Sequence, residues 1–117
     1  MDILVTLNSK YIKPLKVMLK SLFLNNPGES FSIYLMHSDI DDEELENLNS
    51  YIKVNKSDLK IVSVDDSYFK NAPILRHYTK EMYYRLLAFK FLPDGLERIL
   101  YLDPDILVIN PINKLYN

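Results

Sequence analysis

Short apolar runs alternate along this chain with stripes of apolar residues at helical spacing. The runs are rich in strand-forming residues and cover residues 3–7, 31–37, 59–64 and 98–102. The helical stripes cover residues 12–24, 41–52 and 79–91. This order, βαβαβαβ, predicts an α/β fold with a mostly parallel sheet and helices on both faces. A last short strand is expected at residues 106–109.

Individual residues set several of the expected boundaries. Pro14 fits only the first turn of a helix, so the first helix should begin near Ile12 or Lys13. The sequence NNPG at residues 25–28 should end it. Asp41 and Glu44 have the spacing of a capping box for the second helix. Residues 66–78 are the least regular, and we expect a loop with a short helical turn there.

Composition narrows the classes of protein. A length of 117 residues without repeat or linker fits one domain, and a net charge of −2 argues against non-specific nucleic-acid binding. The absence of cysteine excludes disulfides and thiolate chemistry and favours a cytoplasmic protein. The first strand begins at Ile3, which leaves no room for a signal peptide, and no apolar run reaches membrane-spanning length. Peripheral contact with the inner face of the membrane stays open.

Two carboxylates follow the strand at residues 98–102. Asp103 and Asp105 are two positions apart, so in an extended chain they can point the same way, and a divalent cation would relieve their repulsion. A second Asp-x-Asp, Asp39 and Asp41, precedes an acidic helix start and is interpreted as helix capping. The first pair is therefore the candidate site for Mg²⁺ or Mn²⁺, ions that usually hold a phosphorylated substrate.

Ligands of a parallel sheet bind outside the carboxyl ends of its strands. The polar segments after residue 7 and after residue 102 should therefore open on one edge. Neither contains a glycine-rich dinucleotide motif or a Walker loop, so phosphates would be held by a metal and by side chains. Arg85, on the helix before the metal strand, could bind phosphate or form a surface ion pair.

Three segments occur in the order and spacing of one enzyme family. They are residues 8–15 (NSKYIKPL), 83–87 (YYRLL) and 98–105 (RILYLDPD). With them the chain resembles the family-8 glycosyltransferases over essentially its whole length, most closely the bacterial branch that builds lipopolysaccharide and other surface glycans. The resemblance implies a Rossmann-like GT-A nucleotide-sugar-binding fold. It also implies a retaining, metal-dependent enzyme that uses Mn²⁺ or Mg²⁺. Such an enzyme would transfer the hexose of a UDP-sugar, UDP-glucose or UDP-galactose, to a glycan or lipid-linked acceptor.

The resemblance also implies roles for single residues. Asp103 and Asp105 match the metal-binding motif. The implied donor-binding residues are Thr6, Leu7, Asn8, Tyr11, Arg85, Leu102, Asp103 and Pro104. No residue has an evident claim to be a nucleophile or base. Many relatives have Asp where this chain has Asn8 and Asn where it has Lys10, so we expect weaker base recognition, with Lys10 offering a phosphate or carboxylate contact.

In this family the catalytic domain continues past the Asp-x-Asp strand and supplies a third metal ligand, usually a histidine. We therefore expect residues 1–117 to form a single GT-A-type domain, the N-terminal part of a longer catalytic domain truncated after that strand. Neither His37 nor His77 matches the late histidine, and both are interpreted as ordinary polar residues. Apolar surface left exposed near residues 106–109 should promote self-association.

Three functions are considered. The first is a UDP-sugar glycosyltransferase. The second is a nucleotide-sugar binding module or fragment without turnover. It is favoured by Asn8 and by the end of the sequence at Asn117, soon after the Asp-x-Asp motif. The third is a receiver-like α/β interaction domain, for which an acidic pair would be expected after the first strand, where Asn8 and Ser9 stand.

Overall fold

Four parallel strands form one sheet in the order β3-β2-β1-β4. The computed structural model describes residues 1–64 and 88–117. The strands are β1 (Asp2–Thr6), β2 (Ser32–His37), β3 (Asp58–Ser63) and β4 (Leu100–Tyr101). The helices are η1 (Ser9–Tyr11, a 3₁₀ turn), α1 (Ile12–Asn25), α2 (Asp42–Val54), α4 (Ala88–Phe91) and α5 (Asn113–Tyr116). The predicted parallel α/β sheet is confirmed.

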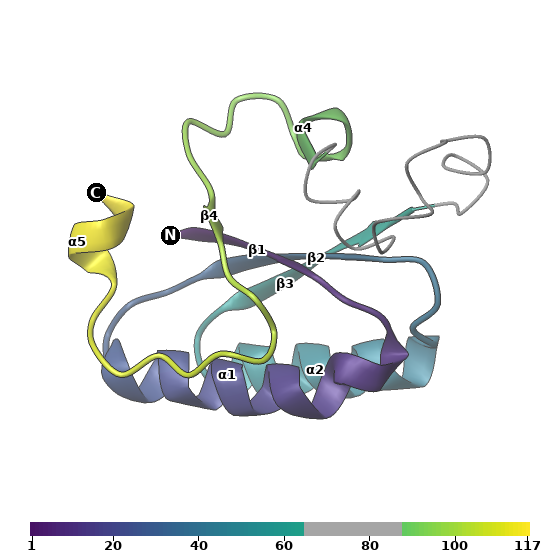
Figure 1. The fold of residues 1–117 in the computed structure, drawn as a ribbon, viewed down its shortest axis with the longest axis horizontal. Coiled ribbons are helices and arrows are strands. Elements are labelled where there is room, and N and C mark those ends of the chain that lie inside the picture. Colours follow the sequence, from purple (N-terminus) through teal and green to yellow (C-terminus); the bar gives the residue numbers. More distant parts are fainter. Residues whose placement is uncertain (65–87) are drawn as a thin grey trace.

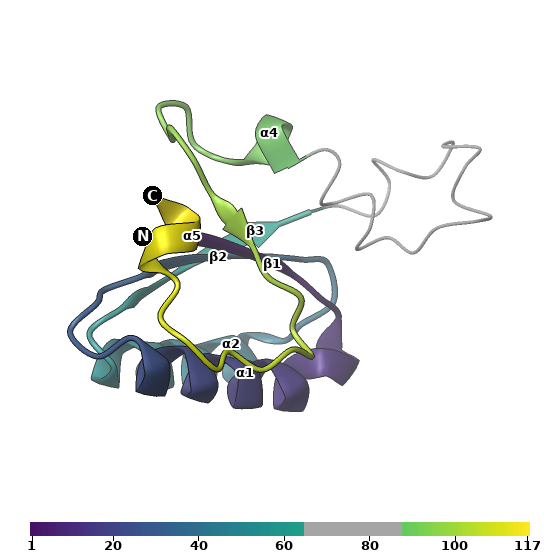
Figure 2. The same cartoon turned by 60° about the vertical axis from the view of Figure 1, so that its left-hand side comes forward.

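Two layers of side chains cover the two faces of the sheet. α1 and α2 lie side by side under one face (Figures 1 and 2). Alternate residues of β1 and β2, such as Val5 and Leu35, pack there against Leu19 and Leu48 of the helices. α4 and the loop after it lie over the other face (Figure 1). Burial of each such side chain contributes roughly 1.5–3 kcal/mol, so these layers supply the main stabilisation of the sheet.

The expected helix boundaries agree with the structure where it describes them. α1 begins at Ile12, with Pro14 inside its first turn. The Asp41 side chain accepts a hydrogen bond of 2.8 Å from the Glu44 N–H, which caps α2. Of the helix expected at 79–91, α4 is the described part, and the rest lies outside the described residues. The loop expected at 66–78 also lies outside them.

The strand predicted at residues 106–109 is wrong. This segment lies along α1 (Figure 1), and α1 side chains bind its backbone in place of a neighbouring strand. Val108 N–H donates to Ser21 Oγ at 2.9 Å, and Asn25 Nδ2 donates to the Val108 carbonyl at 2.7 Å. Ile112 N–H donates to Asn26 Oδ1 at 2.8 Å. Polar side chains of a helix thus replace the backbone partners that a strand would need.

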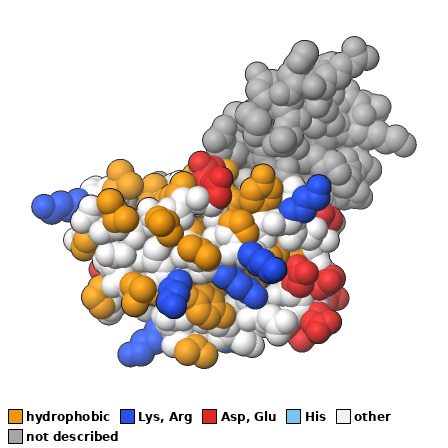
Figure 3. Space-filling model, turned by 60° about the horizontal axis from the view of Figure 1, so that its bottom comes forward, with side chains coloured by type: hydrophobic (Ala, Val, Ile, Leu, Met, Phe, Trp, Pro, Cys, Tyr) orange, Lys and Arg blue, Asp and Glu red, His pale blue; other side chains and the backbone are white. Residues whose placement is uncertain are grey.

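Apolar side chains remain on the surface around this segment. Leu107 and Ile109 are 63% and 75% exposed, on either side of the buried Val108. On the helical layer Val17, Leu24 and Val54 are also exposed, and Figure 3 shows hydrophobic side chains interspersed with basic ones there. Self-association through such surface stays a prediction. Among the described residues no helix is both long and apolar enough to cross a membrane.

Asn26 should be the most sensitive polar residue of this packing. It is 4% exposed, and its amide group donates to the Leu22 carbonyl and accepts from Ile112 N–H, both at 2.8 Å. We expect Asn26→Ala to lower the free energy of unfolding by about 1–3 kcal/mol, because it leaves a buried N–H without a partner. Urea denaturation measures this change. Asn47→Ala, on the exposed side of α2, is the control and should change stability by less than about 0.5 kcal/mol. Equal effects of the two variants would contradict the interpretation.

Candidate functional site

The carboxyl ends of β1 and β4 lie next to each other in the sheet. β1 pairs with β2 on one side and β4 on the other, so the order of strands reverses between β1 and β4. The Leu102 N–H continues this pairing with a 3.0 Å hydrogen bond to the Leu4 carbonyl. Thr6 Oγ1 and the Tyr101 hydroxyl are 3.2 Å apart and join the two strand ends. The expectation that the two polar segments open on one edge is therefore confirmed, and that edge is the switch point where such sheets bind ligands.

The segment after β1 is a compact turn that leads into α1. The side chains of Thr6 and Leu7 are buried, with 2% and 1% of each residue exposed, so only their backbone borders the edge. The Leu7 N–H donates a 3.3 Å hydrogen bond to the Met36 carbonyl and so continues the pairing of β1 with β2. The Asn8 side-chain oxygen accepts a 2.9 Å hydrogen bond from Lys10 N–H and caps η1. One acceptor site of Asn8 is thus already used, and no hydrogen bond of its amide group to another described residue is observed. Tyr11 is 42% exposed, which makes its ring accessible for stacking.

The segment after β4 alternates between buried and exposed residues. Leu102 and Pro104 are buried, whereas Asp103 and Asp105 are exposed. Both carboxylates therefore face solvent at the edge where β1 also ends. They are hard oxygen donors of the kind that Mg²⁺ and Mn²⁺ prefer. Residues 1–64 and 88–117 contain no group of three or more residues that could hold a metal, so the donor set described here is the two carboxylates alone.

Asp39 and Asp41 have different roles, which sequence reasoning did not separate. Asp41 caps α2, as expected. Asp39 instead accepts hydrogen bonds from the N–H and the hydroxyl of Ser9, at 3.2 and 3.4 Å. The interpretation of Asp39 as a helix cap is therefore wrong. No local signal could have revealed a contact between loops that are 30 residues apart in the chain.

His37 is more deeply placed than an ordinary polar residue. It is 5% exposed at the end of β2, and its Nδ1 accepts a 3.2 Å hydrogen bond from Ile40 N–H. Its Nε2 is buried and has no hydrogen-bond partner among residues 1–64 and 88–117. Burial lowers the pKa of His37, against the opposing effect of the nearby Asp39 and Asp42 carboxylates. The ring is therefore a neutral part of the β2–α2 connection.

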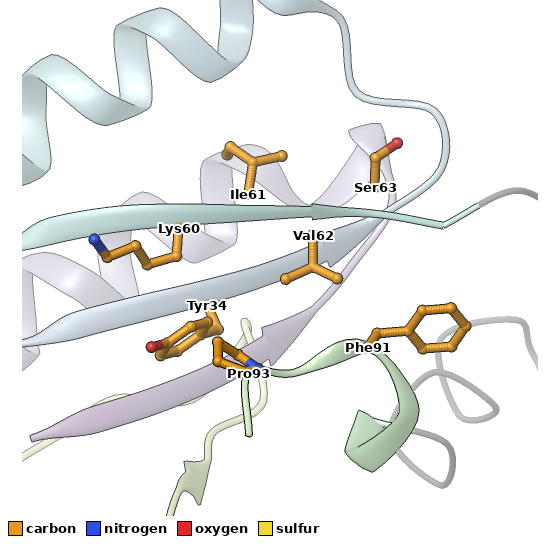
Figure 4. Close-up of a pocket in the computed structure, with 7 residues that line it drawn as sticks. All are labelled: Tyr34, Lys60, Ile61, Val62, Ser63, Phe91 and Pro93. Atoms are coloured by element: carbon orange, nitrogen blue, oxygen red, sulfur yellow. The ribbon is translucent and has the colours of Figure 1, made fainter. Parts of the chain in front are cut away.

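Other predicted residues are not described. Arg85 and His77 lie outside the described residues. A pocket of about 550 Å³ lies at the β3 edge and is lined by Tyr34, Lys60, Ile61, Val62, Ser63, Phe91 and Pro93 (Figure 4). None of the predicted donor-binding or metal-binding residues that the structure describes lines this pocket.

Comparison with known proteins agrees with this architecture. The family model for glycosyl transferase family 8 matches residues 2–117, and the chain belongs to this family. A lipopolysaccharide 1,2-glucosyltransferase of Escherichia coli is 27% identical over 99 residues, which are 85% of this chain and 29% of that protein. Glycosyltransferase GlyF of Streptococcus pneumoniae serotype 4 is 28% identical over 115 residues, which are 98% of this chain and 28% of the relative.

Solved structures show the same fold. The galactosyltransferase LgtC, crystallised with donor and acceptor sugar analogs, superposes with a TM-score of 0.83 at 23% identity, over 98% of this chain and 41% of LgtC. The glycosyltransferase GlyE of Streptococcus pneumoniae TIGR4 gives a TM-score of 0.76 at 24% identity, over 99% of this chain and 26% of GlyE. The fold is thus the one of these glycosyltransferases. The chain spans less than a third of the length of these curated relatives. The share is 29% and 28% for the two named above and 32% for a lipopolysaccharide 1,2-glucosyltransferase of Escherichia coli K12.

The contact between Thr6 and Tyr101 should couple the two strand ends energetically. Tyr101→Phe and Thr6→Val each remove one hydroxyl with little change in shape. In a double-mutant cycle measured by urea denaturation, we expect a coupling energy of about 0.5–1.5 kcal/mol, the usual net contribution of one hydrogen bond. Additive effects of the two substitutions would show that the hydroxyls do not stabilise the edge through each other.

His37 should make stability depend on pH. The unfolded chain binds a proton on this ring near the ordinary histidine pKa of 6.5, whereas burial lowers the pKa in the folded chain. Between these two pKa values the unfolded state binds more protons, so the contribution to stability is present above about pH 6.5 and is lost as the pH falls. His37→Asn keeps an acceptor for Ile40 N–H but cannot titrate. The difference in unfolding free energy between wild type and variant should therefore shrink from pH 7.5 to pH 5, and a constant difference would contradict the assignment.

Proposed function

We propose that the chain binds the nucleotide-sugar donor of a metal-dependent family 8 glycosyltransferase, with retention of configuration in the transfer. The observation that supports this most directly is that two exposed carboxylates, Asp103 and Asp105, follow β4 at the edge of the sheet where the turn at residues 8–11 follows β1. The proposed donor is a UDP-sugar, with UDP-glucose or UDP-galactose as the first candidates. The proposed acceptor is a glycan or a lipid-linked glycan, as in lipopolysaccharide synthesis, at a cytoplasmic site that includes the inner face of the membrane.

Each segment of the edge has a part in this proposal. The backbone at Thr6 and Leu7 and the amide donor of Asn8 would bind the uracil and ribose, with the Tyr11 ring beside them. Leu102 and Pro104 are buried and would hold the chain so that both carboxylates face the diphosphate. Arg85 is proposed as a donor contact on the resemblance alone. Asp103 and Asp105 would hold Mn²⁺ or Mg²⁺, which when bound stabilises negative charge on the departing diphosphate.

The metal-dependent part of this proposal can be tested by calorimetric titration of UDP in the presence of Mn²⁺. We expect binding that falls by about tenfold or more in Asp103→Asn/Asp105→Asn, because two ligands of the bridging cation lose their charge. A chelator should reduce wild-type binding to the level of the variant. The matched control is Asp58→Asn/Asp94→Asn, which also removes two negative charges but at positions outside the loops after β1, β2 and β4. This variant should bind UDP with the affinity of the wild type.

Two results would count against the proposal. Binding that is equal with Mn²⁺ and with chelator would exclude a metal-bridged diphosphate. No UDP binding by a chain that unfolds cooperatively would exclude the donor site altogether.

A second candidate function is nucleotide-sugar binding without turnover. It is favoured by the donor set of two carboxylates, to which the described residues add no third metal ligand. Incubation with UDP-glucose or UDP-galactose separates the two functions. Release or transfer of the sugar supports the transferase, whereas tight binding with intact donor supports the binding module.

A further inference from the structure

Among the described residues, the side chain of Asp39 forms the hydrogen bonds that join the β2–α2 loop to the turn after β1. Asp39 Oδ1 accepts a hydrogen bond of 3.2 Å from Ser9 N–H, and Oδ2 accepts one of 3.4 Å from Ser9 Oγ. The backbone bond is the shorter of the two and does not depend on the identity of residue 9. Ser9 lies between Asn8 and Tyr11, the two residues of this turn proposed to meet the nucleoside.

Asp39 is itself held from both sides. Before it, the His37 ring accepts a hydrogen bond of 3.2 Å from Ile40 N–H, which closes the loop around residue 39. After it, Ile40 is 5% exposed in the core and Asp41 caps α2. The carboxylate therefore projects from a loop that is fixed by the sheet and by α2. In the part of the chain that the structure describes, no other side chain forms a hydrogen bond between residues 8–11 and this loop.

We propose that Asp39 is a positioning residue for donor binding, which holds the turn at residues 8–11 in the conformation that accepts the nucleoside end of the donor. This inference rests on the proposed function. Each carboxylate oxygen of Asp39 accepts one hydrogen bond from Ser9, so its proposed part is to orient the turn.

Charge alone predicts the opposite sign for the effect of removing Asp39. A carboxylate near the site repels a diphosphate, so any substitution that removes the charge should tighten UDP binding if only long-range electrostatics mattered. Loss of the contact to Ser9 should weaken binding because the turn becomes free to move. The direction of the change therefore separates the two effects.

Two substitutions at this position remove the same charge but differ in hydrogen bonding. Asp39→Ala cannot bind Ser9. Asp39→Asn keeps an oxygen for the Ser9 N–H, and its amide can donate to Ser9 Oγ. Calorimetric titration with UDP and Mn²⁺ should show affinity about 3- to 10-fold lower for Asp39→Ala, the range expected for the loss of one or two modest hydrogen bonds. Affinity should be at or slightly above the wild-type value for Asp39→Asn.

Each other outcome overturns the inference. Wild-type affinity in Asp39→Ala would mean that the contact does not matter for the donor. An equal loss in both variants would mean that the negative charge itself is needed, as in a direct contact with the ligand. Urea denaturation of each variant shows whether the chain is folded under the conditions of the titration. If the wild-type protein itself fails to bind UDP, the proposed function fails. If the wild type binds UDP and both Asp39 variants bind it with the same affinity, the proposed function stands and only the role of Asp39 is removed.

Discussion

Parallel pairing of β1 on both sides is the constraint on which the rest of the structure depends. Since every strand runs the same way, every strand ends on the same edge, and the polar residues that follow the strands have to meet there. The order of the strands reverses between β1 and β4, and the polar residues that follow these two strands lie at this switch point, where open α/β sheets bind ligands. A nucleotide site can therefore be built from segments almost 100 residues apart without a glycine-rich loop.

The edge combines burial and exposure over very short distances. Thr6, Leu7, Leu102 and Pro104 are buried, and the residues that follow or separate them, Asn8, Asp103 and Asp105, reach solvent. Anchoring by buried neighbours limits the movement of a charged side chain and so lowers the entropic cost of binding an ion or a ligand. His37 extends the same principle to β2, where a neutral buried ring shapes the loop that presents Asp39.

Side chains, rather than further strands, complete the structure beside α1. Ser21, Asn25 and Asn26 bind the backbone of the segment that follows the Asp-x-Asp motif and keep it against the helix. Ser21 and Asn25 on α1, and Asn26 directly after it, are compatible with a solvent-exposed helix when only the local sequence is considered. In the folded chain they satisfy backbone groups that would otherwise lack partners, and they leave Leu107 and Ile109 at the surface.

The sequence by itself determined the elements up to β3 and the parallel sheet, because the spacing of apolar residues, Pro14 and the Asp41–Glu44 cap act within a few residues. It also determined which segments end at the candidate site, since strand direction follows from the alternation of strands and helices. Only the tertiary structure decided the contact of Asp39 with Ser9, the burial of His37 and the course of residues 106–109 along α1. For Asp39 and for residues 106–109 the partners lie 30 or more residues apart in the chain, so no local pattern could specify them, and the burial of His37 depends on the elements that pack around the end of β2.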